Sequence, residues 1–295
     1  MHEFHFPNWV NRFGVALIFG VLALGGYLAT CLFAAIHPTN VNVGYAPEQP
    51  VPYSHKIHAG KLKLDCRYCH NTVESTAGAY IPPTATCGNC HGANRVKENA
   101  TLGVVFPESQ KLQPVRESLE SAEFGKRSGD PVLWIKVHDL PDFVYFNHSA
   151  HINRGVSCVS CHGRVDKMDV VTQVESLSMK WCLDCHRNPA GNIRPVEFVT
   201  ALDWNPTSDE LKKLFDATLA SQFTKLDPDG NGSVPIEQLQ SFITQPIAVD
   251  SNRDGELSSA ELAAGVTAVD SETLGQLLLV TNGIHPKTNC STCHR

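Results

Sequence analysis

The pattern Cys-x-x-Cys-His occurs five times in this chain and uses 10 of its 11 cysteines. The five motifs, numbered in chain order, span residues 66–70, 87–91, 158–162, 182–186 and 290–294. Chance predicts roughly 0.02 copies for this content of cysteine and histidine. Each motif is typical of c-type haem attachment, in which two thiols bond to the porphyrin and the histidine binds the iron.

These motifs predict five covalently bound haems. The attaching thiols and iron-binding histidines would be Cys66, Cys69, His70, Cys87, Cys90, His91, Cys158, Cys161, His162, Cys182, Cys185, His186, Cys290, Cys293 and His294. Zinc sites do not need a histidine after every second cysteine, and a thioredoxin-like redox pair does not recur five times. The chain contains 18 Pro and 21 Gly, so we expect a mostly α and irregular fold in which porphyrins supply much of the apolar core.

Length and charge limit the number of domains and the kinds of partner. A chain of 295 residues is expected to form about two domains. The net charge of −6 argues against a nucleic-acid partner. Because covalent haem is attached outside the cytoplasm, we expect the haem region on the periplasmic side, with its cysteines in thioether bonds rather than in disulfides.

An apolar run predicts a membrane anchor near the start of the chain. Residues 14–36 carry no charge, and a helix of this length spans roughly 35 Å, enough for a hydrocarbon core of about 30 Å. A cleaved signal peptide is the competing interpretation. Arg12 precedes the run, and the next Lys or Arg is Lys56. The positive-inside rule therefore predicts a cytoplasmic segment 1–13, an inner-membrane anchor 14–37 and extracytoplasmic haems.

Two segments of matching sequence indicate a duplicated two-haem module within residues 38–206. Residues 53–58 and 146–151 both read aromatic-x-His-x-x-His, and each segment is followed by two attachment motifs. A low-spin haem iron needs a second axial ligand. The four histidines that would supply it are His55, His58, His148 and His151. Histidines three residues apart lie on one face of a short helix, so one helix could serve two haems; the alternative is that one of each pair is a core or solvated histidine.

The fifth haem, in the C-terminal segment 281–295, needs a partner ligand of its own. The candidates are Met168, Met179, His138, His285 and His37. A methionine thioether raises the haem potential relative to two histidines. Each methionine could equally be an apolar filler against a porphyrin face, so the sequence leaves this ligand open.

Residues 207–280 predict a helical insertion of the EF-hand type. Residues 250–261 fit the 12-residue calcium loop throughout, whereas residues 227–238 match through position 7 and carry Gln238 where a bidentate Glu is usual. The candidate calcium ligands are Asp227, Asp229, Asn231, Ser233, Asp250, Asn252, Asp254, Glu256 and Glu261. We expect one or two structural calcium ions; the alternative is a pair of acidic turns that need no metal.

The sequence resembles the pentahaem, membrane-anchored cytochrome c subunit of bacterial alternative complex III, and its haem modules are similar to those of class III or c7 cytochromes. The resemblance covers residues 1–206 and 284–295 and rests on APEQPVPYSHKIHAGKLKLDCRYCHNT, WIKVHDLPDFVYFNHSAH, SCVSCHGRVDKMDVV, SLSMKWCLDCHRNP and TNCSTCHR. The acidic segment 207–280 departs from this family.

The resemblance implies a role in a quinol:electron-acceptor oxidoreductase of the respiratory chain. The implied partners are an iron–sulfur/molybdopterin-like subunit, integral membrane subunits that bind quinol, a monohaem cytochrome c, and a soluble electron acceptor or terminal oxidase. The chain would carry electrons without a substrate site or catalytic residues of its own.

Three other functions are compatible with five haem motifs. A multihaem quinol-oxidising donor for a nitrite- or nitrate-type reductase usually places its first haem closer to the anchor than the 29 residues between Ile36 and Cys66 allow. A multihaem enzyme needs a haem with one open axial position, whereas this chain has enough ligands to fill every iron. A calcium-regulated carrier would require haem potentials that change with calcium.

Overall fold

The structure is a computed structural model, and it describes residues 6–37, 42–92, 109–120, 129–239 and 249–294. Its elements are mostly short helices joined by irregular segments. The prediction of a mostly α and irregular fold is therefore confirmed.

The apolar run forms the helix α1 (Asn8–Ile36), which has 29 residues and whose most apolar 18-residue window has a mean hydropathy of 2.2. The helix begins six residues before the predicted anchor, and His37 follows its last residue as the C-cap. None of its most apolar window is buried against the rest of the chain. Within the described residues it is the one helix long and apolar enough to cross a membrane, although a signal sequence near an N-terminus has the same character.

The haem motifs lie on short helices, and polar side chains cap several of them. Asp65 accepts a hydrogen bond from the Arg67 N–H at the start of motif one, and Ser157 accepts from the Val159 N–H at motif three. Such N-caps satisfy backbone donors that a helix leaves unpaired. The body of short helices consists of η2 (Lys56–Lys61), α2 (Cys66–Cys69), α3 (Thr84–His91), η4 (Gln110–Leu112), α5 (Gln113–Glu120), α6 (His148–Ile152), α7 (Cys158–His162), η5 (Val165–Lys167), α8 (Met179–Arg187), η6 (Ala190–Asn192), η7 (Val196–Phe198) and α14 (Cys290–Cys293).

The segment between motifs four and five forms a helical lobe with a two-stranded sheet. Its elements are α9 (Ser208–Leu226), β1 (Ser233–Pro235), α10 (Ile236–Leu239), β2 (Glu256–Ser258), α12 (Ser259–Gly265) and α13 (Ser271–Thr281). The strands are antiparallel, with Val234 opposite Leu257. Capping boxes begin both α9 and α12.

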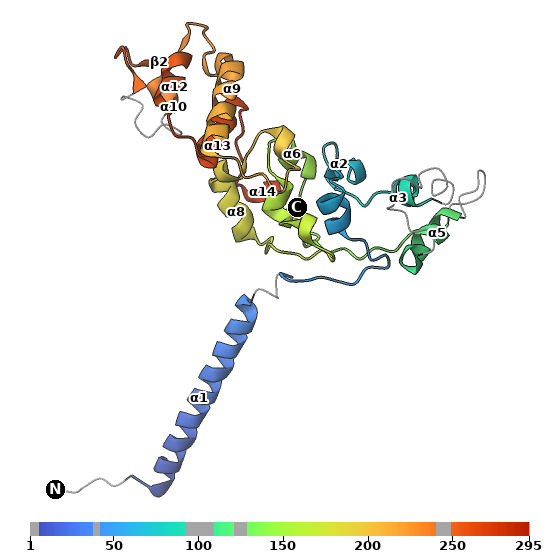
Figure 1. Ribbon diagram of the computed structural model, residues 1–295. Helices are drawn as coiled ribbons and strands as arrows, with labels where there is room; N and C mark the ends of the chain where they lie inside the picture. The colour runs from blue at the N-terminus through green and yellow to red at the C-terminus, as the bar shows by residue number, and fades with distance from the viewer. Residues whose placement is uncertain (1–5, 38–41, 93–108, 121–128, 240–248, 295) are drawn as a thin grey trace, which may run out of the picture.

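Figure 1 shows how these parts are arranged. The helix α1 projects away from the body of short helices. The helices α3 and α5 lie at one end of this body, and the lobe with α9, α12 and α13 lies at the other end. The last helix, α14, returns to the body beside α8. Motifs four and five, which these two helices carry, are therefore close in space although the lobe separates them in sequence.

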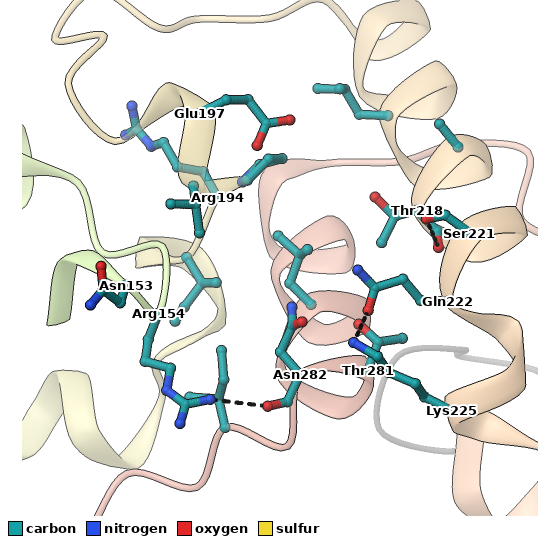
Figure 2. Close-up of a pocket in the computed structure, with 17 residues that line it drawn as sticks. Asn153, Arg154, Arg194, Glu197, Thr218, Ser221, Gln222, Lys225, Thr281 and Asn282 are labelled. Carbon is teal, nitrogen blue, oxygen red and sulfur yellow. Dashed lines mark hydrogen bonds between the residues drawn. The ribbon is translucent and has the colours of Figure 1, made fainter. Parts of the chain in front are cut away.

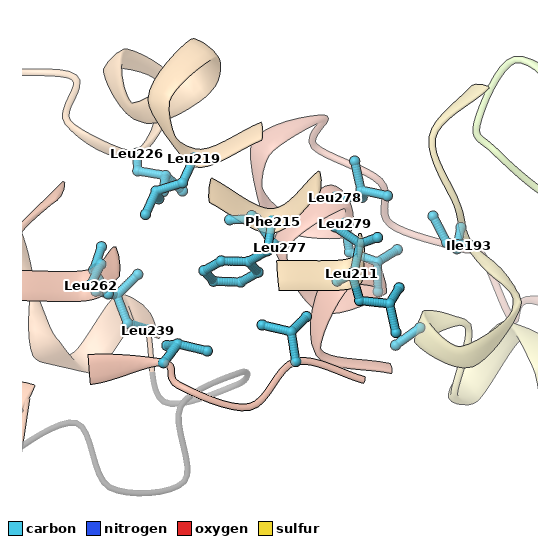
Figure 3. Packing of buried hydrophobic residues seen from close by; sticks show 14 of the residues in the cluster. Ile193, Leu211, Phe215, Leu219, Leu226, Leu239, Leu262, Leu277, Leu278 and Leu279 are labelled. Atoms are coloured by element: carbon cyan, nitrogen blue, oxygen red, sulfur yellow. The ribbon is translucent and has the colours of Figure 1, made fainter. Parts of the chain in front are cut away.

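The lobe has a continuous apolar core, shown in Figure 3. Leu211, Phe215 and Leu219 recur every four residues along α9 and are buried, as expected for the inner face of an amphipathic helix. They pack with leucines of α13 and with the paired strands. Ala190 and Ile193, which follow motif four in the body, belong to the same cluster.

The body has far less protein core. Its own buried cluster consists of Val73, Ile152 and Val199, with Cys158 packed against it. These residues come from both haem modules, so this small cluster joins the modules together. Large apolar side chains beside the motifs, including Tyr68, Tyr80 and Phe143, remain exposed and offer contacts for large apolar groups.

The core of the lobe predicts the effect of truncating its central ring. Phe215 is fully buried, so Phe215→Ala should lower the free energy of unfolding of the lobe by about 3–5 kcal/mol through lost burial and a cavity. Urea unfolding followed by the helical circular dichroism signal would measure this change. Thr224→Ala, on an exposed position of the same helix, is the control. An unfolding midpoint unchanged by Phe215→Ala would contradict this packing.

Candidate functional site

In the first aromatic-x-His-x-x-His segment, one aromatic ring contacts both histidines. The Tyr53 ring stacks on His58, with centroids 4.3 Å apart and planes at 22°. The same ring meets His55 edge-on, at 4.8 Å and 86°. His58 lies in the π-helix η2, and His55 is the residue that precedes it, whereas the sequence predicted both histidines on one regular helix.

The second segment has nearly the same geometry. The Phe146 ring stacks on His151 at 4.5 Å and 26°, and meets His148 edge-on at 4.8 Å and 88°. Both histidines lie in α6, as expected. In each segment a single aromatic ring therefore orients two imidazoles differently, which allows them to face different motifs.

Three of these histidines face the histidine of an attachment motif. The ring centroids of His58 and His91 are 6.2 Å apart, those of His148 and His162 are 6.4 Å apart, and those of His151 and His186 are 6.0 Å apart. Two imidazoles that bind one metal from opposite sides, at about 2 Å each, place their centroids about 6 Å apart. The three spacings fit two-sided ligation of a haem iron.

His55 lies beside the remaining motif histidine of the first module. Burial, and then the charge of the neighbouring His70, lower the pKa of His55 to about 4. Burial, and then the neighbouring His138, lower the pKa of His162 to about 3. Both imidazoles are neutral at neutral pH, and the neutral ring is the form that binds metal.

Backbone carbonyls fix the proton position on five of these rings. Because a carbonyl can only accept a hydrogen bond, each Nδ1 carries the proton and each Nε2 keeps its lone pair for a metal. The Nδ1–H groups donate as follows: His58 to Ser54 O at 2.9 Å, His70 to Tyr80 O at 2.9 Å, His148 to Ala77 O at 2.9 Å, His151 to Asn147 O at 2.7 Å, and His186 to Lys287 O at 2.8 Å. Sequence reasoning missed these acceptors, because a main-chain carbonyl leaves no trace in the residue types.

The two modules exchange contacts near their distal histidines. His148, in the second module, donates to Ala77 of the first module through both its backbone N–H and its ring. In return, the Lys56 N–H donates to the Met168 carbonyl at 3.0 Å. Each module therefore supports the histidine helix of the other.

The motif thiols show which motifs are neighbours. A hydrogen bond between the Cys66 and Cys158 thiols lowers the pKa of Cys66 and raises that of Cys158. Motif one therefore touches motif three. On the other side of motif one, the Asn89 amide donates to the Tyr68 hydroxyl at 3.1 Å, which joins motif two to motif one.

Motifs three, four and five continue this series. Burial, and then the neighbouring Cys185, raise the pKa of Cys161 to about 12. Burial, and then the neighbouring Cys293, raise the pKa of Cys182. Motif four therefore lies between motif three and motif five.

The fifth motif is held by the segment that precedes the second module. The Tyr145 N–H donates to the Cys293 carbonyl at 2.7 Å, and Val144 forms a β-bridge with His294. The Phe143 ring stacks on His294 with centroids 5.8 Å apart.

The five candidate ligands of the fifth haem lie in different places. The His138 ring lies 4.4 Å from that of His162, at motif three, and Met168 lies beside the first module. Met179 is an exposed residue at the start of α8, His285 is exposed, and His37 caps α1.

In the lobe, the two predicted calcium loops lie back to back across β1 and β2. In the second loop, Asp250 accepts hydrogen bonds from the Arg253 and Gly255 N–H groups at 2.6 and 3.0 Å. Hydrogen bonds from the Ser251 hydroxyl and from Ser258 lower the pKa of Glu261 to about 2, so this carboxylate is charged at neutral pH. Gly255 has a φ of +83°, a conformation that glycine adopts without strain.

The first loop has the same kind of backbone bonding. Asp227 accepts from the Asn231 and Gly232 N–H groups at 3.1 and 2.8 Å. The side chain of Gln238, at position 12, lies outside the part of the chain that the structure describes. Throughout the described part, no three or more His, Cys, Asp or Glu side chains are grouped as a metal cluster.

One carboxylate reaches from the second loop to the first. Glu256 lies opposite Pro235 in the strand pairing, and its Oε2 accepts from the Ser233 hydroxyl and from Asn231 Nδ2, the latter at 3.4 Å. The sequence assigned Glu256 to the second loop alone. The strand register, which no single loop shows, brings it to the first.

Comparisons with known proteins agree with the haem motifs. The family described as cytochrome c7 and related cytochrome c matches residues 144–197, which hold motifs three and four. The chain is also 31% identical, over 115 residues, to the multihaem cytochrome c subunit of menaquinone reductase from Nitratidesulfovibrio vulgaris strain Hildenborough. This match covers 39% of the chain and 46% of the relative, so the chain spans about half the length of that relative.

The match and the geometry support the same interpretation for the body of the molecule. Residues 144–197 contain α6, α7 and α8, with the two histidine pairs of the second module. The body of this chain thus contains a multihaem cytochrome c domain similar to cytochrome c7.

Proposed function

We propose that this chain is a membrane-anchored pentahaem cytochrome c that carries electrons between a quinol-oxidising membrane complex and an extracytoplasmic acceptor. The observation that supports it best is the set of opposed histidines about 6 Å apart, each facing an attachment motif. Bound c-type haem supplies a one-electron iron couple.

Each histidine has a defined task in this proposal. The pairs that would hold the first four haem irons are His55 with His70, His58 with His91, His148 with His162, and His151 with His186. His294 would hold the fifth, opposite one of the candidates Met168, Met179, His138, His285 and His37. The carbonyls that accept from Nδ1 keep each ring in the metal-binding tautomer. With both axial positions filled, the sites suit electron transfer rather than substrate binding, which disfavours a multihaem enzyme.

The contacts between motifs give the order in which electrons would pass. The Cys66–Cys158 contact and the Asn89–Tyr68 hydrogen bond place motif one between motifs two and three. The helix α6 carries one histidine for motif three and one for motif four, and motif five follows motif four. We infer a linear order of motifs 2–1–3–4–5, which differs from the order in sequence.

The partners follow from the resemblance to alternative complex III and from the menaquinone reductase relative. We propose an inner-membrane location, with α1 retained as a single-pass anchor, residues before it in the cytoplasm and the haem body in the periplasm. The partners would be an iron–sulfur/molybdopterin-like subunit, integral membrane quinol-binding subunits, a monohaem cytochrome c and a soluble acceptor.

The relative also favours a second candidate function. It belongs to a menaquinone reductase, so the same series of haems could deliver electrons to a quinone instead of receiving them. The direction would then depend on the partner complex, and the residues of this chain would keep the same tasks.

The test of the quinol-linked function uses the assembly purified from membranes in mild detergent. Added quinol should reduce the haems, as followed by their absorbance, and integral membrane subunits should copurify. An intact assembly whose haems stay oxidised with quinol but pass electrons to added menaquinone after chemical reduction would favour the second candidate. A chain that copurifies with a terminal nitrite or nitrate reductase would contradict both.

The ligand pairs predict the result of removing one distal histidine. His151→Ala should leave the haem of motif four with one axial ligand, because His151 is the ring that faces His186. Electron paramagnetic resonance should then show one high-spin haem per chain in place of one low-spin haem. Ser149→Ala, on the same helix, should leave all signals unchanged. A low-spin spectrum unchanged by His151→Ala would contradict the pairing.

We propose that the lobe binds calcium as a structural ion. The ligands would be Asp250, Asn252, Asp254, Glu256 and Glu261 in the second loop, and Asp227, Asp229, Asn231 and Ser233 in the first. Oxygen ligands at this spacing suit calcium. The paired strands and the charged Glu261 support a site in the second loop, and Glu256 offers the first loop a carboxylate where Gln238 lacks one.

Calcium binding can be measured by calorimetry on the detergent-purified protein. Glu261→Gln should weaken the affinity of the second loop by about tenfold or more, because a bidentate carboxylate becomes a neutral amide. Glu272→Gln, an exposed acidic position at the start of α13, is the matched control. Absence of any calcium uptake by the wild-type protein would show that the loops are acidic turns.

A further inference from the structure

The helical lobe is connected to the haem body mainly through one helix. The helix α13 packs on α9 inside the lobe and on the short turn η6 of the body. Gly275 lies directly over this turn: a Cβ at this position would lie 1.9 Å from the Ala190 carbonyl oxygen. Only glycine allows the two backbones to approach so closely.

The turn η6 follows the fourth haem motif closely. It begins at Ala190, four residues after His186. The lobe core includes Ala190 and also Ile193, the residue directly after η6. Ile193 reaches that core from the body side in Figure 3. The backbone that follows the motif-four histidine is therefore anchored in the lobe core as well as in the body, where Ile193 forms a β-bridge with Val156.

The segment after α13 returns to the same motif. The Ile284 N–H donates to the Leu279 carbonyl at 2.9 Å, so the chain stays tied to α13 as it leaves the lobe. Three residues later the Lys287 carbonyl accepts the Nδ1 proton of His186 at 2.8 Å. The fifth motif begins three residues after Lys287.

The lobe also contacts the distal side of motif four. Arg154, which follows His151 in the chain, donates to the Asn282 carbonyl at 3.2 Å, as Figure 2 shows. Beside this contact lies an open cleft of about 720 Å³ between α9 and α13 on one side and the loops 153–154 and 193–197 on the other. Because the cleft separates the two parts there, the junction consists of the contacts of α13 and the residues after it, together with Val156, Ala190 and Ile193 of the body, which pack on the lobe core.

We infer that the lobe is a brace that sets the geometry of the fourth and fifth haem sites, with Gly275 and Lys287 as positioning residues. The lobe packs on the backbone after His186, and its helix α13 leads directly into the segment that carries the acceptor of the His186 ring proton and the start of the fifth motif. A change in the junction should therefore alter these two sites and leave motifs one, two and three unaffected. This inference rests on the proposed haem ligation of His186 and His294.

The test compares two glycine substitutions in the full-length protein purified from membranes. Gly275→Ala forces α13 away from η6, whereas Gly191→Ala lies in η6 itself and meets no atom within 4 Å. Redox titration and electron paramagnetic resonance report the midpoint potentials and g values of the individual haems. Gly275→Ala should shift both quantities for two haems of the five, those of motifs four and five, and Gly191→Ala should shift none.

A second variant distinguishes a local change at the junction from general unfolding of the lobe. Arg154→Gln removes the hydrogen bond to Asn282 from an exposed side chain, and it should give a smaller shift in the motif-four signal. Five haem signals at their wild-type values in a folded Gly275→Ala protein would overturn the inference, as would shifts spread over all five. A wild-type protein with fewer than five haems, or without two axial ligands at motif four, would instead contradict the proposed function. The spectra of the wild-type protein give this result before any variant is made.

Discussion

The hydrogen bond from histidine Nδ1 to a main-chain carbonyl is the interaction on which the haem body depends. It fixes the tautomer, keeps the Nε2 lone pair available for a metal, and sets how strongly the ring binds that metal. Two of the acceptors are distant in sequence and belong to another part of the chain: Ala77 for His148, and Lys287 for His186. The ligand geometry of one site is thus built from the backbone of another, which makes the sites one structural unit.

This arrangement explains the uneven distribution of apolar core. The body has a small buried cluster at the contact between its modules, whereas the lobe has a large one. A chain that attaches porphyrins covalently needs little apolar protein core around them, and its loops can be short and irregular. The lobe has no attachment motif and must bury its own leucines. Its core also contains Ala190 and Ile193, so the part of the molecule with the most protein packing contacts the backbone that follows motif four.

The sequence identifies which residues form the candidate sites, but it does not show how these sites are arranged in space. The attachment motifs, the four added histidines and the helical lobe follow from residue types at fixed spacing, and the mostly helical, irregular fold is confirmed. The order of the motifs in space could not be predicted, because it depends on the contact between Cys66 and Cys158, which are 92 positions apart. The π-helix that follows His55 and the close approach at Gly275 depend on tertiary packing that local propensity does not contain. Glu256 reaches the first acidic loop only through the register of two strands.

The most direct test of the proposed electron path is the spatial order of the five haems in a cryo-electron microscopy map of the membrane-purified protein. The structure predicts that the haem of motif one lies between those of motifs two and three, and that the haem of motif five is next to that of motif four. Each of the first four irons should have a histidine on both sides. A map in which the haem of motif one is at an end of the series, or in which motif five is next to motif two, would contradict the proposed path.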